Sequence, residues 1–332
     1  MGPEWGAIEG GRNSLKDLIS IADLSEDEVR GILDRAAELK AMHKRGVLHQ
    51  PLRSKTLGMF FEKPSLRTRV TFEVGMSHLG GHAILLTPEH IAIGVRETVA
   101  DVARNLERWV DLVVARTFSH QLVVDLAKYA SIPVINGLTD LLHPCQILAD
   151  IFTLVERFKD VNGVKVAYLG DGNNVANSWI NGAVKTGIDL TLAVPDGYEP
   201  HAGVLAAARA YGKPGGRKIR VLHDPHEAVA DADVIYTDVW ASMGQEAERE
   251  ERIKIFRPYQ VNRDLVSKAK PRALIMHCLP AHRGEEITDE VLDGPNSIVF
   301  DEAENRLHVQ KAVMEILAAG AASGGGGMPR DF

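Results

Sequence analysis

The chain has 332 residues, a formal net charge of -7, 45% hydrophobic residues and 25% charged residues. This length predicts two domains, and the acidic balance without a long basic stripe argues against a nucleic-acid partner. No apolar run approaches the ~18 residues that a membrane span requires, and the N-terminal residues resemble neither a signal peptide nor a transit peptide. Because Cys145 and Cys278 are the only cysteines, no disulfide framework is implied, and we expect a cytoplasmic protein.

Hydrophobic periodicity predicts helices that alternate with short strands. The first helical pattern runs from Ser14 to His43 and has its clearest start signal at Ser25, which acidic residues follow. Strands rich in β-branched residues are expected at 56–61, 83–86, 112–115, 133–135, 164–169, 190–194, 219–222, 234–237, 273–276 and 298–300. Further helices are expected at 65–79, 98–109, 123–129, 202–210, 263–269 and 309–319. This alternation predicts an α/β fold with parallel strands.

The strand and helix pattern occurs twice along the chain. We therefore predict two domains, each a parallel β-sheet flanked by helices, joined by interdomain helices. A helix that begins near Pro144 lies at the junction. The predicted divisions are a first domain at 1–145, a second domain at 146–305, a C-terminal helix at about 306–320 that packs back on the first domain, and a flexible tail at 321–332.

The segment 61–69 carries a candidate anion site directly after a predicted strand. Pro64 and Ser65 favour the start of a helix. A helix N-terminus presents unpaired N–H groups, and Arg67 and Thr68 lie in its first turn. A hydroxyl and a guanidinium group beside such N–H groups suit a phosphate, whereas the alternative is a capped helix start that faces solvent.

The sequence around Pro144 opens the junction helix with polar residues. Proline suits the first helical position, and His143 and Gln146 are three residues apart, so both can face one ligand. A neutral histidine can donate a hydrogen bond to a carbonyl oxygen, and a glutamine amide oxygen can accept one from an NH₂ group. The alternative is a capped helix with a packed histidine and a buried Cys145.

A glycine turn at 170–172 follows another predicted strand. A dinucleotide-binding fingerprint would require a third glycine or alanine where this chain has Val175, so a nicotinamide dehydrogenase is not supported. Asn173 and Asn174 instead provide two amides that can bind the carboxylate and amine of an amino acid. The alternative is a turn that asparagine and glycine favour for backbone reasons.

Asp238 follows a further predicted strand, and its carboxylate can pair with a substrate ammonium group. Ser242 and Gly244 suggest a mobile lid, in which Met243 offers a flexible apolar contact. The charged run at 246–252 has instead the pattern of a solvated helical face.

Cys278 also follows a predicted strand and can act on a ligand as a thiol or, near cations, as a thiolate. Zinc is the rival interpretation because His277, Cys278 and His282 cluster, but with one other cysteine in the chain a structural zinc site is not favoured. Arg116 and Arg306 are further candidate anion ligands. These segments follow predicted strands, and open α/β sheets bind ligands at the carboxyl ends of their strands.

Together these motifs resemble those of the ornithine carbamoyltransferase family. The residues that carry the resemblance are Ser65-Leu66-Arg67-Thr68-Arg69, His143-Pro144-Cys145-Gln146, Asp238 with Ser242-Met243-Gly244, and His277-Cys278-Leu279-Pro280. The similarity extends from about Leu15 to about Ile316, nearly the whole chain. The first motif is common to carbamoyltransferases, whereas the Ser-Met-Gly loop favours ornithine over aspartate, acetylornithine or putrescine.

The resemblance implies transfer of a carbamoyl group from carbamoyl phosphate to the side-chain amine of L-ornithine, giving L-citrulline and phosphate. It implies no metal and no organic cofactor, and its partners are the two substrates rather than a nucleic acid or a membrane. A carbamoyltransferase for another amine, and a non-catalytic regulator that binds anions or amino acids on the same fold, are the alternatives.

The resemblance also implies roles for individual residues. Carbamoyl phosphate would be bound by Ser65, Leu66, Arg67, Thr68, Arg116, His143, Gln146, Cys278, Leu279 and Arg306. Ornithine would be bound by Asn174, Asp238, Ser242 and Met243. The catalytic residues would be Arg116, His143, Asp238 and Cys278.

Two positions depart from the pattern of the family. Leu66 replaces a frequent threonine, a change that is tolerated if the backbone N–H does the binding. Ala92 stands where many relatives have a Gln or His that reaches the site of a neighbouring subunit. The resemblance still predicts a homotrimer or a multiple of trimers.

Overall fold

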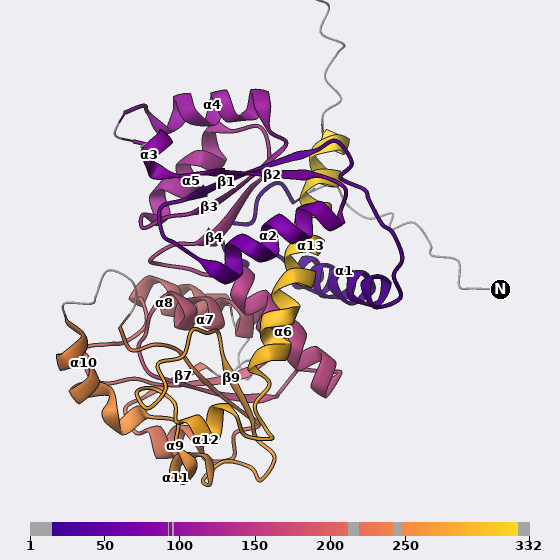
Figure 1. The fold of residues 1–332 in the computed structure, drawn as a ribbon. Helices are drawn as coiled ribbons and strands as arrows, with labels where there is room; N and C mark the ends of the chain where they lie inside the picture. Colours follow the sequence, from indigo (N-terminus) through magenta and orange to yellow (C-terminus); the bar gives the residue numbers. More distant parts are fainter. Residues whose placement is uncertain (1–14, 92, 95, 212–218, 242–247, 325–332) are drawn as a thin grey trace, which may run out of the picture.

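The computed structural model describes residues 15–91, 93–94, 96–211, 219–241 and 248–324, and their strands form two parallel sheets (Figure 1). The first sheet has the order β2-β1-β3-β4, with β1 (Thr56–Phe61), β2 (His82–Leu86), β3 (Leu112–Arg116) and β4 (Val134–Leu138). The second has the order β7-β6-β5-β8-β9, with β5 (Lys165–Leu169), β6 (Asp189–Ala193), β7 (Ile219–Leu222), β8 (Val234–Thr237) and β9 (Leu274–His277).

The predicted two-domain α/β architecture is confirmed, and the strands expected between residues 56 and 276 are present with small differences at their ends. The strand expected at 298–300 is wrong. Ser297 forms a single parallel bridge with Ile275, and the N–H of Ile298 donates to the carbonyl of Ile275 at 3.0 Å. A helix then begins at once, because acidic residues in its first turn favour a helix N-terminus.

Helices flank both sheets. Around the first sheet lie the 3-10 helix η1 (Ile21–Asp23), α1 (Glu26–Lys44), α2 (Leu66–His78), α3 (Pro88–Ile91), α4 (Val99–Trp109) and α5 (His120–Tyr129). Around the second lie α7 (Asn174–Thr186), α8 (Ala202–Tyr211), α9 (Pro225–Val229), α10 (Arg249–Phe256), η3 (Arg257–Tyr259), α11 (Arg263–Val266) and α12 (Asp289–Leu292).

The first long helix, α1, begins later than the pattern from Ser14 predicted. Leu18 forms a parallel bridge with Ile135 of β4, which keeps the segment before η1 extended. Ser25 then caps α1: its hydroxyl accepts the N–H of Glu28 at 3.1 Å, and its own N–H donates to the Glu28 carboxylate at 2.7 Å.

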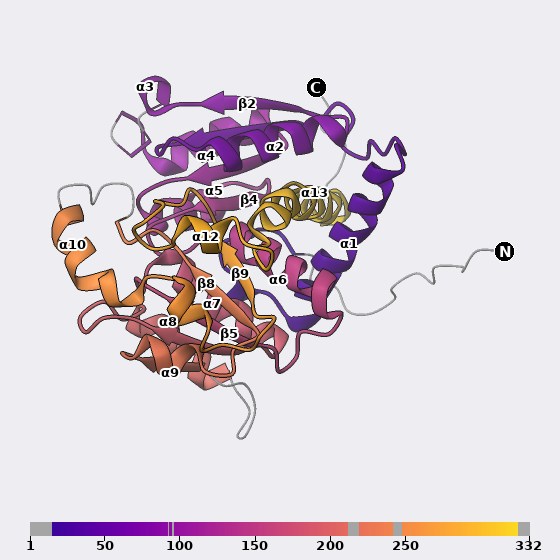
Figure 2. The same cartoon turned by 60° about the horizontal axis from the view of Figure 1, so that its bottom comes forward.

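Helices α6 (Pro144–Phe158) and α13 (Val299–Gly324) join the two halves. α13 packs against α1, α2 and α6, and in Figure 2 it lies between α2 and α6. The C-terminal helix expected at about 306–320 is thus present but longer, and 321–324 of the expected tail belong to it. Residues 325–332 lie outside the described part, and the domain boundary at 145/146 stays a prediction.

One apolar core extends across both sheets. It contains Leu57 and Met59 of β1 as well as Val166 and Tyr168 of β5. Helix α6 is buried from Pro144 to Leu154, so the residues at its start have a rigid base. Over the described part of the chain, no helix has the length and apolar character needed to cross a membrane.

Candidate active site

Strand β1 and helix α2 put the predicted anion-binding segment at the carboxyl edge of the first sheet. Ser65 caps α2, and its hydroxyl accepts the N–H of Thr68 at 3.2 Å. The side chain of Leu66 is 73% exposed, which leaves its backbone as the group available to a ligand. Arg69 turns away to Glu73, with its Nε 3.2 Å from the carboxylate, whereas Arg67 interacts electrostatically with buried Arg116.

Three chain segments meet at Thr68. Its Oγ1 accepts hydrogen bonds from Nη1 of Arg116, at the end of β3, and from Nη2 of Arg306, in α13, at 3.3 and 2.8 Å. All three side chains are buried, and the Nε of each arginine has no partner among the described residues. Burial, followed by repulsion from Arg306, lowers the pKa of Arg116 to about 9, so it is still a cation at neutral pH. Paired buried guanidinium groups favour an anion beside them.

His143 precedes α6 and is almost fully buried. Its backbone N–H donates to Oγ of Ser178 at 2.7 Å, and its Nδ1 has no partner within the described residues. Burial, followed by repulsion from Arg306 and Arg116, lowers the pKa of His143 well below its usual 6.5. The ring is therefore neutral at physiological pH, which is the form that can donate one hydrogen bond to a carbonyl oxygen.

Gln146, in the first turn of α6, has its amide fixed on both sides. Its Nε2 donates to Oδ1 of Asp150 at 2.8 Å and to Oε1 of Glu302 at 3.0 Å, and its Oε1 accepts from Arg306. A carbonyl oxygen has two lone pairs, so one remains for a ligand N–H. Asp150 was not among the predicted site residues, although it lies four residues after Gln146 on the same helix face; the acids of 301–306, Glu302 among them, were expected only to cap or pair.

Asp238 and Cys278 follow the neighbouring strands β8 and β9 and meet at the carboxyl edge of the second sheet. The Sγ of Cys278 lies 3.0 Å from Oδ1 of Asp238, and Nδ2 of Asn173 donates to Oδ2 of Asp238 at 2.8 Å. Burial, followed by the negative charge of Asp238, raises the pKa of Cys278 well above its usual value. The geometry therefore favours the thiol over the thiolate.

The other residues predicted to bind ornithine are only partly described. Asn174 begins α7, and its Nδ2 donates to the carbonyl of Thr139 at 2.7 Å, which connects the second sheet's helices to the loop after β4. The side-chain amide of its neighbour Asn173 donates instead to Asp238 and orients that carboxylate, so the two adjacent amides have different partners. Ser242 and Met243, like Ala92, lie outside the described residues.

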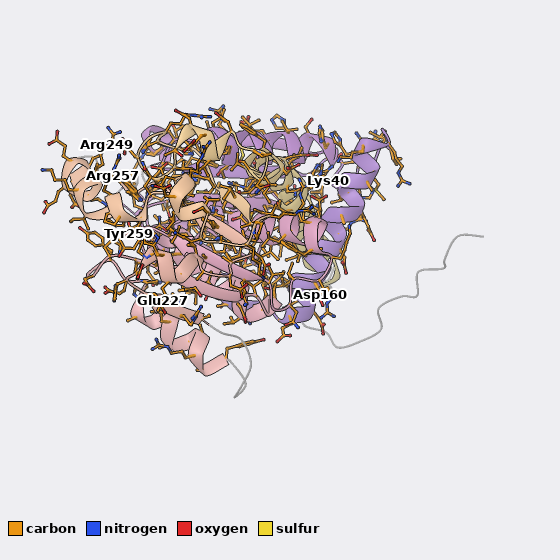
Figure 3. The ribbon with its side chains drawn as sticks, turned by 90° about the horizontal axis from the view of Figure 1, so that it is seen from below. Lys40, Asp160, Glu227, Arg249, Arg257 and Tyr259 are labelled. Atoms are coloured by element: carbon orange, nitrogen blue, oxygen red, sulfur yellow. The ribbon has the colours of Figure 1, made fainter. Side chains whose placement is uncertain are left out.

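In the described part of the charged run at 246–252, residues 248–251 are exposed, as the predicted solvated face requires, but Arg252 is an exception. Arg252 is 4% exposed; its Nη2 pairs with Asp171, and its Nε donates to the carbonyl of Trp240. Burial raises the pKa of Asp171 to about 6 in spite of this pairing. Arg249, at the start of the same helix, lies at the outer edge of the molecule (Figure 3).

Three possible metal ligands lie within 4.8 Å of one another, from Asp238, His277 and Cys278. His277, however, uses both ring nitrogens. Its Nδ1 accepts the N–H of Leu279 at 2.8 Å, and its Nε2 lies 3.1 Å from Oε1 of Glu286. The ring proton is therefore on Nε2, facing the carboxylate, and no lone pair is left for zinc. The same contact holds Leu279, whose φ is 57°, beside Cys278.

Known proteins with this fold share both halves of the chain. Family models match residues 16–156 as the carbamoyl-P binding domain of aspartate/ornithine carbamoyltransferases and residues 162–317 as their Asp/Orn binding domain. The ornithine carbamoyltransferase of Pyrococcus abyssi is 56% identical over 309 residues, which are 93% of this chain and 98% of that protein. That of Syntrophus aciditrophicus is 55% identical over 302 residues, 91% of this chain and 99% of its own.

A solved structure gives the same result. The ornithine carbamoyltransferase of Pyrococcus furiosus superposes with a TM-score of 0.89 at 55% identity, covering 92% of this chain and 97% of its own. The two matched domains put the protein among the enzymes that transfer carbamoyl groups. The chain belongs to the aspartate/ornithine carbamoyltransferase family, as the motifs predicted.

Proposed function

We propose that the protein is an ornithine carbamoyltransferase, which transfers the carbamoyl group of carbamoyl phosphate to the side-chain amine of L-ornithine in arginine biosynthesis. The observation that supports the proposal most strongly is that a cluster of buried arginines lies next to the pair formed by Cys278 and Asp238. The buried cations Arg116 and Arg306 both lie close enough to Cys278 for a charge there to affect their pKa values, and the Cys278 thiol is hydrogen-bonded to Asp238. A cationic site for a phosphate thus adjoins an acidic site for an amine. The relatives that are more than half identical carry the same activity in their names.

The phosphate is bound at the start of α2. The first turn of a helix has N–H groups without helical partners, and the positive end of the helix dipole favours an anion. The groups in reach are the backbone N–H groups of Ser65, Leu66 and Arg67, the hydroxyls of Ser65 and Thr68, and the guanidinium of Arg67; the N–H of Thr68 already donates to Ser65. Arg306 completes the cationic wall.

The carbamoyl oxygen accepts hydrogen bonds from Arg116, His143 and Thr68. Because Oγ1 of Thr68 accepts from two guanidinium groups, its own hydrogen points away from them and can be donated. The carbamoyl NH₂ donates to the free lone pair of Gln146 Oε1. Cys278 and Leu279 contact the reacting ends of both substrates.

Ornithine is held by Asp238 and Asn174, with Ser242 and Met243. An amine like that of lysine has a pKa of about 10.4, so only ~0.1% is the free nucleophile at about pH 7.5. Asp238 orients the amine and eases the loss of its proton. Nitrogen attacks the carbamoyl carbon, and the resulting oxyanion is stabilised by the three donors named for the carbamoyl oxygen. The C–O bond to phosphate then breaks, and the leaving phosphate takes up the proton that nitrogen releases.

The proposal includes the organisation of the molecule. Residues 1–145, with α13 returning over 306–320, form the carbamoyl phosphate domain, and 146–305 form the ornithine domain; this division is supported by the bond from Arg306 to Thr68. On the resemblance we add a homotrimer or a multiple of trimers. The unpaired Cys145 and Cys278 suit the reducing cytoplasm.

The test is to supply carbamoyl phosphate and ornithine and to measure both products. Citrulline and phosphate are expected in equal amounts. Phosphate without citrulline would mean hydrolysis rather than transfer. Binding of both substrates without any product would instead support the non-catalytic regulator.

A further inference from the structure

A buried pair of carboxyl groups lies behind the carbamoyl phosphate residues. Asp150 of α6 and Glu302 of α13 are fully buried and hydrogen-bonded to each other. Neither is needed for any step described above. Two buried acids beside a single cation, Arg306, would be costly if both were ionised, so their presence calls for a physical explanation.

The surroundings of the pair supply donors only. Nε2 of Gln146 donates to one oxygen of each acid, at 2.8 and 3.0 Å. The hydroxyl of Tyr236 lies 2.9 Å from Oδ2 of Asp150 and 3.4 Å from Oε1 of Glu302. The backbone N–H of His277 donates to Oε2 of Glu302 at 3.1 Å. All four carboxyl oxygens therefore already act as acceptors.

Two carboxyl groups in mutual contact need a hydrogen between them. An ionised carboxylate accepts only, so two ionised groups could not hydrogen-bond and would repel each other. Burial raises the pKa of Asp150 to about 7 and raises the pKa of Glu302 well above its usual value, in the second case with help from the neighbouring charge of Asp150. Arg306 supplies one positive charge nearby, and Tyr236 and Cys278 are the other titratable groups that interact with the pair.

We propose that Asp150 and Glu302 share one proton and act as positioning residues that fix Gln146 and Arg306 for carbamoyl phosphate. The proposal rests on the proposed function for its substrate. The pair then has a single negative charge, which balances the positive charge of Arg306. Its oxygens accept hydrogen bonds from Gln146, so the NH₂ of Gln146 must face the pair. The amide oxygen is then turned toward Arg306, which leaves Nη2 of Arg306 for Thr68.

The same pair also reaches the ornithine side. Tyr236, which contacts both acids, lies on β8 two residues before Asp238. His277, whose backbone N–H donates to Glu302, is the residue directly before Cys278. The pair thus holds the ends of β8 and β9 against α6 and α13. One shared proton fixes residues from both halves of the site.

The first test detects the proton directly and does not depend on activity. At about pH 8 an ordinary carboxyl, with a pKa near 4, is ionised. The infrared difference spectrum of wild type minus Glu302→Gln should therefore contain the C=O band of a protonated acid. Glu315→Gln is the matched control, because Glu315 lies on the same helix and pairs with Arg35. No acid band lost in Glu302→Gln would overturn the shared proton, whether or not the chain makes citrulline.

The second test separates positioning from mere packing. Glu302→Gln replaces the protonated acid by an amide that still donates to Asp150, so KM for carbamoyl phosphate should rise by at most about threefold. Glu302→Leu fills similar space but removes the carboxyl that shares a proton with Asp150, which keeps only Gln146 and Tyr236 as partners, and it leaves the N–H of His277 without an acceptor. Its KM for carbamoyl phosphate should rise by about tenfold to a hundredfold. Equal KM values for the two variants, with wild-type citrulline formation intact, would contradict the proposal.

Discussion

The Sγ of Cys278 lies 3.0 Å from Oδ1 of Asp238, and in this contact the thiol donates and the carboxylate accepts. The two residues follow adjacent parallel strands, so the register of β8 and β9 sets the distance. Because Cys278 is a thiol here, its contribution is a hydrogen bond and a position rather than nucleophilic attack.

Cys278→Ser keeps a donor toward Asp238, whereas Cys278→Ala removes it. We expect the serine variant to exceed the alanine variant in kcat/KM for ornithine by about tenfold, the worth of one hydrogen bond to a charged group. Steady-state kinetics at saturating carbamoyl phosphate measure the ratio. Cys145→Ala is the control, since the hydrogen bond of Cys145 Sγ in the described part of the chain goes to a backbone carbonyl, that of Asn136, and not to Asp238. Equal kcat/KM in the serine and alanine variants would count against the donor role.

Arg67→Ala should weaken carbamoyl phosphate binding, because it removes a cation from the start of α2. A charge-assisted hydrogen bond contributes about 1.5–3 kcal/mol, which corresponds to a rise in KM of about tenfold or more. Arg69→Ala is the matched control: Arg69 pairs with Glu73 on the solvent side, and such exposed pairs contribute at most about 1 kcal/mol. Near-normal KM in Arg67→Ala would refute the assignment of the phosphate site.

Arg252→Ala should destabilise the second domain. The change leaves Asp171 buried without its partner, and breaking a buried pair costs about 3–5 kcal/mol. Urea unfolding of both proteins gives the difference in the free energy of unfolding. Arg249→Ala, which removes an exposed partner of Glu285 from the same helix, should cost no more than about 1 kcal/mol. Equal losses in the two variants would mean that burial does not decide the effect.

His308 should make the fold less stable in acid. Burial, followed by repulsion from Lys311 and Lys40, lowers its pKa to about 3, whereas an unfolded histidine titrates near 6.5. Between these values the unfolded chain binds one more proton than the folded chain, so stability falls by about 1.4 kcal/mol for each pH unit below 6.5.

The check for His308 is the difference in free energy of unfolding between about pH 7 and about pH 5. His308→Gln should reduce the loss of stability over this range, and His82→Gln, a change at an exposed residue of β2, should not. An unchanged loss in His308→Gln would show that the acid sensitivity has another source.

Much of the framework follows from local sequence patterns. The apolar run of β1 and the capping residue Ser65 are adjacent signals, and both depend only on neighbouring residues. The rule that ligands bind at the carboxyl ends of parallel strands also predicted that Arg116, Asp238 and Cys278 would serve one site. Their electrostatic contacts in the structure agree with that expectation.

Local sequence patterns gave wrong predictions where the conformation or burial of a residue depends on partners that are distant in the sequence. The apolar residues at 298–300 read as a strand because a short run has no clear period, yet the contact with β9 is a single bridge at Ser297 that ends with the hydrogen bond of Ile298. Arg252 has the spacing of a surface residue, but its buried partner is 81 residues away. Asp150 and Glu302 are 152 residues apart, and nothing near either residue reveals the pairing.

The glycine turn at 170–172 shows the same limit. A Cβ on Gly172 would lie 2.3 Å from the backbone nitrogen of Pro200 and 2.5 Å from the carbonyl oxygen of Tyr198. This glycine is therefore required by a loop that follows β6, not by a dinucleotide. Sequence spacing excluded the dinucleotide fingerprint, but the close approach of that loop depends on the folded sheet.

The most direct test of the proposed function compares amine acceptors. Carbamoyl phosphate is supplied with ornithine, putrescine, acetylornithine or aspartate in parallel, and kcat/KM is measured for each. Ornithine should be preferred by about a hundredfold or more, because each rival acceptor loses part of its recognition. Putrescine lacks the α-carboxylate and α-amine, acetylornithine has its α-amine blocked, and aspartate lacks the side-chain amine that attacks. Equal or better use of another acceptor would contradict the assignment of the ornithine site, and no carbamoylated product from any acceptor would contradict carbamoyl transfer itself.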